Sequence, residues 1–117
     1  MADKVVHFEV VGKDGPKLMQ FYGQLFGWTV NADNPMNYGM VDAAESGIGG
    51  GISAAQEGGD GHLTFYVGVD DLQATLDKAE SLGGKTVTPP MEIPNVVTFA
   101  LLTDPEGHLV GLVDNNT

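Results

Sequence analysis

Two ionisable residues share one face of an apolar strand near the start of the chain. Residues 5–11 read VVHFEVV, and the alternation of a strand places His7 and Glu9 on one side, with Phe8 and valines on the other. An imidazole and a carboxylate on one face can bind a polar ligand group or act as an acid–base pair. The alternative is structural: Glu9 would accept a backbone hydrogen bond or face a partner subunit, and His7 would be a partly exposed strand residue.

A second run, residues 62–69 (HLTFYVGV), repeats this pattern. Its alternation places His62, Thr64 and Tyr66 on one face. The tyrosine offers a hydroxyl on an aromatic body, which is a frequent component of ligand pockets. Tyr38 and Phe99 lie in other strand-like runs and are expected to add apolar lining. The predicted ligand-binding residues are therefore His7, Glu9, Tyr38, Thr64, Tyr66 and Phe99.

The elements around these residues form an internal repeat. Each of the two runs is followed by an acidic cap, an amphipathic helix and a glycine stop, and then by shorter strand-like runs. The chain therefore reads as one domain of two β-α-β-β-β modules, residues 1–56 and 62–117. A glycine-rich linker, Gln56–Gly61, joins them. We predict an α+β fold in which the two modules form a curled mixed sheet around a cleft.

Local signals set the expected bounds of the elements. Asp14 and Asp70 or Asp71 are N-cap candidates, and Gly27 is placed to end the first helix. Pro89-Pro90 is expected to end the strand that begins at Lys85. A hairpin turn is predicted at DPEG, residues 104–107. The first helix carries an apolar stripe expected to be core: Leu18, Phe21, Tyr22, Leu25 and Phe26.

Composition excludes several classes of partner. The 117 residues include 5 lysines, no arginine and 16 acidic residues, for a net charge of −11. Phosphate backbones bind through lysine and arginine, so nucleic acid and anionic membrane surfaces are not expected partners. The negative electrostatic potential of the chain favours a neutral or cationic small molecule over an anionic one. There is no cysteine, no apolar run long enough for a membrane span and no signal-peptide pattern, so we expect a cytoplasmic protein.

Three stretches together resemble the vicinal-oxygen-chelate superfamily, which contains glyoxalase I, extradiol dioxygenases and bleomycin-resistance proteins. They are HFEVVGKDG with FYGQLFGW, FYVGVDDLQATLDKAESLGGK, and FALLTDPEGHLVGLV, and they cover nearly the whole chain. The resemblance implies the glyoxalase/bleomycin resistance/dioxygenase fold.

The resemblance also implies a divalent metal, held by one side chain from the first and one from the last strand of each module. Carried onto this sequence, the first position falls on His7. The position in the second module falls on Thr64, or on His62 if the strand is shifted by two residues. Both last-strand positions, where the family has glutamate, fall on glycines, in the run Gly49–Gly51 and at Gly111. No metal or other cofactor is therefore expected, and His7 and His62 are the candidate ligands if a divalent metal is bound.

Three alternative functions are compatible with these residues and with the resemblance. The first is a metal-free protein that binds a small neutral or cationic molecule in its cleft. The second is a metal-dependent lyase or dioxygenase of the same superfamily, using His7 with His62 or Glu9. The third is a non-catalytic assembly protein whose cleft is closed by side chains. In each case we expect a homodimer, since small proteins of the fold that the resemblance implies commonly pair.

Overall fold

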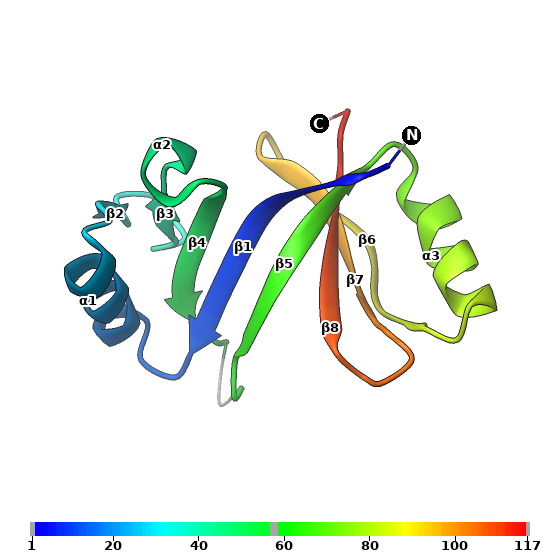
Figure 1. Ribbon diagram of the computed structural model, residues 1–117, viewed down its shortest axis with the longest axis horizontal. Coiled ribbons are helices and arrows are strands. Elements are labelled where there is room, and N and C mark those ends of the chain that lie inside the picture. Colours follow the sequence, from blue (N-terminus) through cyan, green and yellow to red (C-terminus); the bar gives the residue numbers. More distant parts are fainter. Residues whose placement is uncertain (1, 57–58, 117) are drawn as a thin grey trace. The chain divides into compact units, whose positions relative to one another are not determined.

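The computed structural model describes residues 2–56 and 59–116 (Figure 1). The chain forms two compact units. The first unit comprises residues 7–63. The second comprises residues 1–6 together with residues 64–117. Each unit contains a four-stranded mixed sheet and a long helix, so the predicted α+β class is confirmed. Among the described residues, no helix is long and apolar enough to cross a membrane.

The first unit follows the predicted strand–helix–strand order. Its strands lie in the order β2-β3-β4-β1, with β1 parallel to β4 and the other neighbours antiparallel. The helix α2, a single turn, was not predicted. Its elements are β1 (Lys4–Gly12, which begins in the second unit), α1 (Gly15–Phe26), β2 (Val30–Asn31), β3 (Gly39–Val41), α2 (Ala43–Ser46) and β4 (Gly49–Ala54).

The second unit repeats that order. Its strands lie in the order β5-β8-β7-β6, with β5 parallel to β8 and β7 antiparallel to its two neighbours. Its elements are β5 (His62–Val69, which begins in the first unit), α3 (Leu72–Ser81), β6 (Lys85–Ile93), β7 (Val97–Thr103) and β8 (Leu109–Asp114).

Both long helices begin at the predicted caps. The Asp14 carboxylate accepts the backbone N–H of Lys17, and the Asp71 carboxylate accepts that of Ala74. These bonds satisfy backbone donors that have no partner inside the helix. Gly27 ends α1 in the left-handed conformation, with φ of 76°, where glycine is favoured.

Each unit has its own apolar core between its sheet and its long helix. Val10, Val41 and Ile52 are buried in the first unit, with Phe8, Tyr22 and Trp28 packed against them. In the second unit the buried residues surround α3: Val69, Leu72, Leu76, Ala100, Leu102 and Leu112. Because these side chains fill the helix-facing side of each sheet, the residues between them on the strands point to the opposite side.

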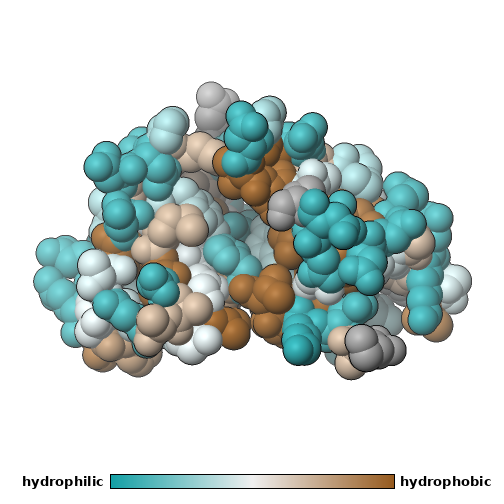
Figure 2. Space-filling model, turned by 90° about the horizontal axis from the view of Figure 1, so that it is seen from above, coloured by the Kyte–Doolittle hydropathy of each residue, from teal (hydrophilic) through white to brown (hydrophobic). Residues whose placement is uncertain are grey.

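The predicted apolar stripe of α1 is only partly core. Leu18 and Tyr22 are half-buried, whereas Phe21, Leu25 and Phe26 are each more than half exposed. The prediction was wrong for these three because only the side of the helix that carries Leu18 and Tyr22 packs against the core. Figure 2 shows apolar residues, in brown, at the surface among hydrophilic ones.

The strand that begins at Lys85 does not end at Pro89-Pro90, as was predicted, but continues to Ile93. β6 is the last strand in the order of its sheet, so a proline can sit in it with its nitrogen turned away from β7. The pairing with β7 shifts register between Thr88 and Met91, across the two prolines. The hairpin at residues 104–107 is confirmed, with the Gly107 N–H bonded to the Asp104 carbonyl at 2.9 Å.

Candidate functional site

The sheet face opposite α1 carries the ionisable residues of β1. Phe8 and Val10 pack toward the helix, so His7 and Glu9 point to the other side. Glu9 pairs in register with Gly51 of β4. The first unit therefore presents an imidazole and a carboxylate beside a strand residue that has no side chain.

Four side chains form one hydrogen-bonded group on this face, which we call the Glu9 network: His7, Glu9, Tyr38 and His62. The Tyr38 hydroxyl lies 2.8 Å from the His7 Nε2 and donates to the Glu9 Oε2 at 2.8 Å. The His62 Nε2 lies 2.7 Å from the Glu9 Oε1. Residues separated by up to 53 positions in the sequence are thus joined within one unit.

The direction of these bonds follows from the charge of Glu9. An ionised carboxylate only accepts, so both of its partners must donate to it. The Tyr38 proton is committed to Glu9, and the Tyr38 oxygen therefore accepts from the His7 Nε2–H. His62 likewise carries a proton on its Nε2. Glu9 is the acceptor on which the network converges.

The network lies at the surface yet is largely shielded from solvent. The Glu9 side chain is 14% exposed and that of His62 is 28% exposed. Burial lowers the pKa of His7 below its ordinary value of 6.5, and the negative charge of Glu9 opposes that shift only in part. The neutral form of His7 is therefore favoured at pH 7, and its Nε2–H tautomer is the one that donates to the Tyr38 oxygen.

Tyr38 is held by its own loop. Asn34, which the sequence analysis did not single out, donates from Nδ2 to the Tyr38 carbonyl at 2.7 Å and accepts the Tyr38 N–H at 3.0 Å. Asn37, between them, adopts a positive φ of 52°, which asparagine tolerates. Local asparagine bonds of this kind are typical of turns, and the pattern of asparagines before Tyr38 is the only sequence signal for them.

The other predicted site residues belong to the second unit. The Thr64 side chain is buried, and its hydroxyl donates to the Leu109 carbonyl at 2.6 Å. Tyr66 is 7% exposed and pairs in register with Gly111, over which its ring lies. Phe99 is half-buried and pairs with Val113 on β8, which places it on the same sheet face as Tyr66 and Gly111.

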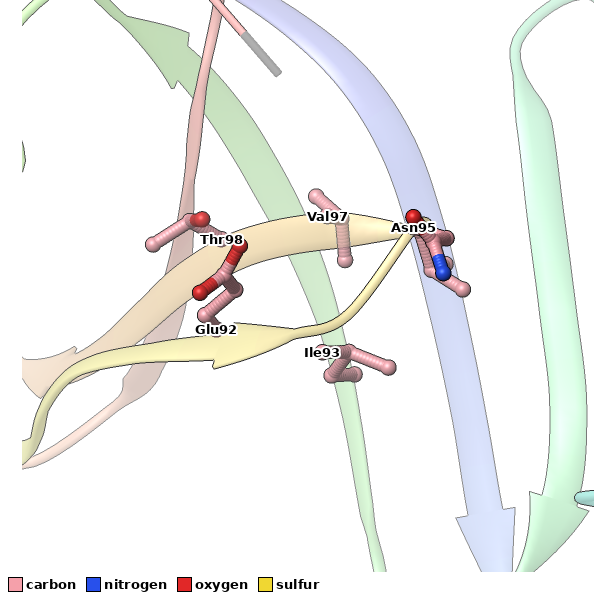
Figure 3. A pocket seen from close by; sticks show the side chains of 6 residues that line it. Glu92, Ile93, Asn95, Val97 and Thr98 are labelled. Atoms are coloured by element: carbon pink, nitrogen blue, oxygen red, sulfur yellow. The ribbon is translucent and has the colours of Figure 1, made fainter.

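Two hollows share no lining residue with the Glu9 network. One, of about 370 Å³, sits at the turn between β6 and β7, where Glu92 and Thr98 lie side by side on neighbouring strands (Figure 3). The other, of about 420 Å³, is lined by residues of β2, β3 and α2 and their flanks. Neither is lined by a histidine, and the carboxylate of Glu45 in the second hollow is already bonded to Thr29.

The residues present do not fit the metal that the resemblance implies. Each unit has a glycine where the last strand would supply a carboxylate, and a tyrosine ring covers that glycine: Tyr38 over Gly51 and Tyr66 over Gly111. Thr64 is committed to a backbone carbonyl. Across residues 2–56 and 59–116, no three His, Cys, Asp or Glu residues are grouped so that they could hold a metal ion.

Comparison with known proteins agrees with this architecture. Residues 4–112 match the family model described as "Glyoxalase/Bleomycin resistance protein/Dioxygenase superfamily". The "Putative glyoxylase CFP32" of Mycobacterium tuberculosis is 33% identical over 104 residues, which cover 86% of this chain and 40% of that protein. The chain thus spans about two fifths of the length of this curated relative.

Solved structures share the fold at low sequence identity. A hypothetical protein, BH1468, from Bacillus halodurans C-125 has a TM-score of 0.70 at 14% identity, covering 98% of this chain and 96% of that one. Methylmalonyl-CoA epimerase from Mycobacterium tuberculosis has a TM-score of 0.63 at 16% identity, covering 94% and 86% of the two chains. The predicted glyoxalase-type fold is confirmed.

Proposed function

Because this chain belongs to the glyoxalase/bleomycin resistance protein/dioxygenase superfamily, we propose that it binds a small neutral or cationic organic molecule, without a metal, at the Glu9 network. The observation that carries the proposal is the convergence of Tyr38 and His62 on one partly buried carboxylate. A carboxylate held in this way favours a ligand that brings a positive charge or a hydrogen-bond donor.

The surroundings of Glu9 support a partly aromatic ligand. The rings of His7 and Tyr38 lie in nearly parallel planes, 15° apart, with centroids 6.1 Å apart. Aromatic faces attract cations as well as other rings. The net charge of −11 raises the local concentration of cations and disfavours anions. A cationic or neutral ligand with an aromatic part satisfies all three features.

The test is a binding screen of the wild-type chain against aromatic amines and quaternary ammonium compounds, with aromatic carboxylates of similar size as the opposite-charge set. Binding is measured by thermal shift and calorimetry. We expect amine binding that weakens by about 10- to 100-fold in Glu9→Gln, which keeps the shape but removes a charged hydrogen bond worth about 1.5–3 kcal/mol. Glu106→Gln, at an exposed turn position, removes the same charge and should leave binding unchanged.

A third variant separates this site from the hollow of Figure 3. Glu92→Gln removes the carboxylate that lines the hollow without touching the Glu9 network. If Glu92→Gln abolishes amine binding and Glu9→Gln does not, the proposed site is wrong. Preferential binding of the carboxylate set would overturn the proposed class of ligand.

A lyase of the same superfamily is the second candidate function. One observation favours it: a tyrosine proton and a histidine proton both lie within hydrogen-bond reach of one carboxylate, which is the geometry of general acid–base catalysis. A catalysed reaction would be lost in both Glu9→Gln and Tyr38→Phe. A binding site would lose affinity chiefly in Glu9→Gln.

We also propose that the chain is a cytoplasmic homodimer. Fourteen large apolar side chains are exposed among the described residues, including Leu63 at 73% and Leu82 at 68%. Such side chains are the candidates for a surface that a second copy of the chain would cover, provided that they lie together. Light scattering during size exclusion should give twice the 12.3 kDa of one chain. A mass of one chain at micromolar concentration would contradict the proposal.

A further inference from the structure

A tyrosine ring lies on a glycine of the last strand in both units. A β-carbon built on Gly51 would overlap the ring and hydroxyl of Tyr38, and one built on Gly111 would overlap the ring of Tyr66. Atoms cannot share this space, so neither glycine can carry a side chain while its tyrosine stays in place. Ring and glycine therefore form a matched pair in each unit.

In the first unit the tyrosine also occupies the point on which the polar groups converge. The His7 Nε2 and the Glu9 Oε2 both lie 2.8 Å from the same Tyr38 oxygen. Zinc and similar ions need nitrogen and oxygen ligands at about 2.0–2.2 Å in direct contact. The hydroxyl thus takes the position that an ion between His7 and Glu9 would require, and it holds these two groups apart.

Hydrogen bonds to its backbone hold Tyr38 in place. Both backbone polar groups of Tyr38 are bonded to Asn34, and the Asn37 N–H is bonded to the Asn34 carbonyl at 3.0 Å. Asn34 therefore fixes the backbone from which the Tyr38 side chain extends, and Gly51 leaves the space that the Tyr38 ring occupies. Displacing the Tyr38 side chain means breaking the bonds of its hydroxyl to His7 and Glu9.

We infer that Tyr38 excludes divalent metal ions from the group formed by His7, Glu9 and His62. This inference rests on the proposed function for the location of the site and deepens it, because it gives the reason that the site works without a metal. Two histidines and one carboxylate are a recognised ligand set for divalent transition metals. Removal of the Tyr38 side chain would leave His7 and His62 beside the same carboxylate, with the place of the hydroxyl open to an ion.

The experiment uses the full chain without a metal-affinity tag. The wild type and Tyr38→Ala are dialysed against zinc chloride, desalted and analysed for zinc, and cobalt(II) absorption reports the coordination geometry. We expect only trace zinc in the wild type and about one equivalent in Tyr38→Ala. Adding Glu9→Gln to Tyr38→Ala should return zinc to trace, since it removes the carboxylate ligand.

A second pair of variants covers the case in which Tyr38→Ala does not fold. Tyr38→Phe removes only the hydroxyl and should hold more zinc than the wild type. Tyr22→Phe, which changes a tyrosine that packs on Trp28 in the core, should not. A wild type with one equivalent of zinc would overturn the inference, as would a folded Tyr38→Ala or Tyr38→Phe that stays at trace. A folded variant that stays at trace overturns the inference alone, whereas a failed amine-binding screen on the wild type overturns the proposed function alone, so the two failures are distinguishable.

Discussion

The contact between Tyr38 and Gly51 gives the sharpest test of the geometry. In Gly51→Ala the new methyl group would overlap the Tyr38 ring, so the ring must move away from Glu9. Overpacking costs about 1–3 kcal/mol, and the loss of a hydrogen bond to a charged group costs about 1.5–3 kcal/mol. We expect a total loss of about 2–4 kcal/mol in the free energy of unfolding, since relaxation of the ring recovers part of the sum. At about 4 °C per kcal/mol, the melting temperature should fall by roughly 10 °C.

Gly49→Ala is the matched control on the same strand. A β-carbon there would meet only the Val41 carbonyl oxygen at 3.7 Å and the Ala43 nitrogen at 4.0 Å, both ordinary contacts. Its effect should be neutral or stabilising by up to about 1 kcal/mol, because alanine restricts the unfolded chain. Urea denaturation followed by circular dichroism measures both variants.

A double-mutant cycle then isolates the ring. In a Tyr38→Ala background the overlap is gone, so Gly51→Ala should cost less than about 0.5 kcal/mol, leaving a coupling energy of about 2 kcal/mol. An equal cost of Gly51→Ala in both backgrounds would refute the placement of Tyr38 over Gly51. So would a Gly49→Ala variant as unstable as Gly51→Ala.

Three further predictions concern other parts of the chain. Burial lowers the pKa of His7, so just below pH 6.5 the unfolded chain binds more protons than the folded chain, and stability should fall as the pH drops through that value. The urea midpoints at pH 7.5 and pH 5.5 should therefore differ less in His7→Gln than in the wild type. An equal difference in the two proteins would contradict the lowered pKa. Asp71→Ala should cost about 0.5–2 kcal/mol by removing the cap of α3, whereas Asp77→Ala, at an exposed position inside the helix, should cost less; urea denaturation of the two variants decides this. Gly111→Ala should cost about 1–3 kcal/mol, because the Tyr66 ring over it is buried; a midpoint like that of the wild type would show that the ring can move.

The parts of the fold that were predictable are those with local causes. Asp14 and Asp71 cap helices through bonds that span three residues, and Gly27 ends a helix by its own backbone conformation. Strand alternation correctly put His7 and Glu9 on the face opposite α1. These features do not depend on contacts between distant parts of the chain, so they can be predicted from a single sequence.

The failures have non-local causes. Pro89-Pro90 is compatible with a strand only because β6 is the last strand in the order of its sheet, and strand order is set by the whole unit. Phe21 and Phe26 look like core by helical spacing, yet the tertiary packing of α1 covers the side that carries Leu18 and Tyr22 instead. The position of the Tyr38 hydroxyl depends on the register of β3 against β4 and on Asn34, and no periodicity reports either.

The register of the strands explains why the last-strand glycine lies beside a carboxylate in the first unit and beside a tyrosine in the second. Glu9 pairs with Gly51 in the first unit, and Tyr66 pairs with Gly111 at the corresponding place in the second. In the second unit the tyrosine comes from the first strand itself, so it fills the space over the glycine and leaves no carboxylate there. In the first unit the tyrosine comes from the segment before β3, so the first strand keeps Glu9, and the hydroxyl bonds to it. The double variant Glu9→Tyr, Tyr38→Ala copies the arrangement of the second unit into the first. It should remove amine binding because the carboxylate is lost. The first unit should stay folded because a tyrosine on the first strand covers the glycine, as it already does in the second unit.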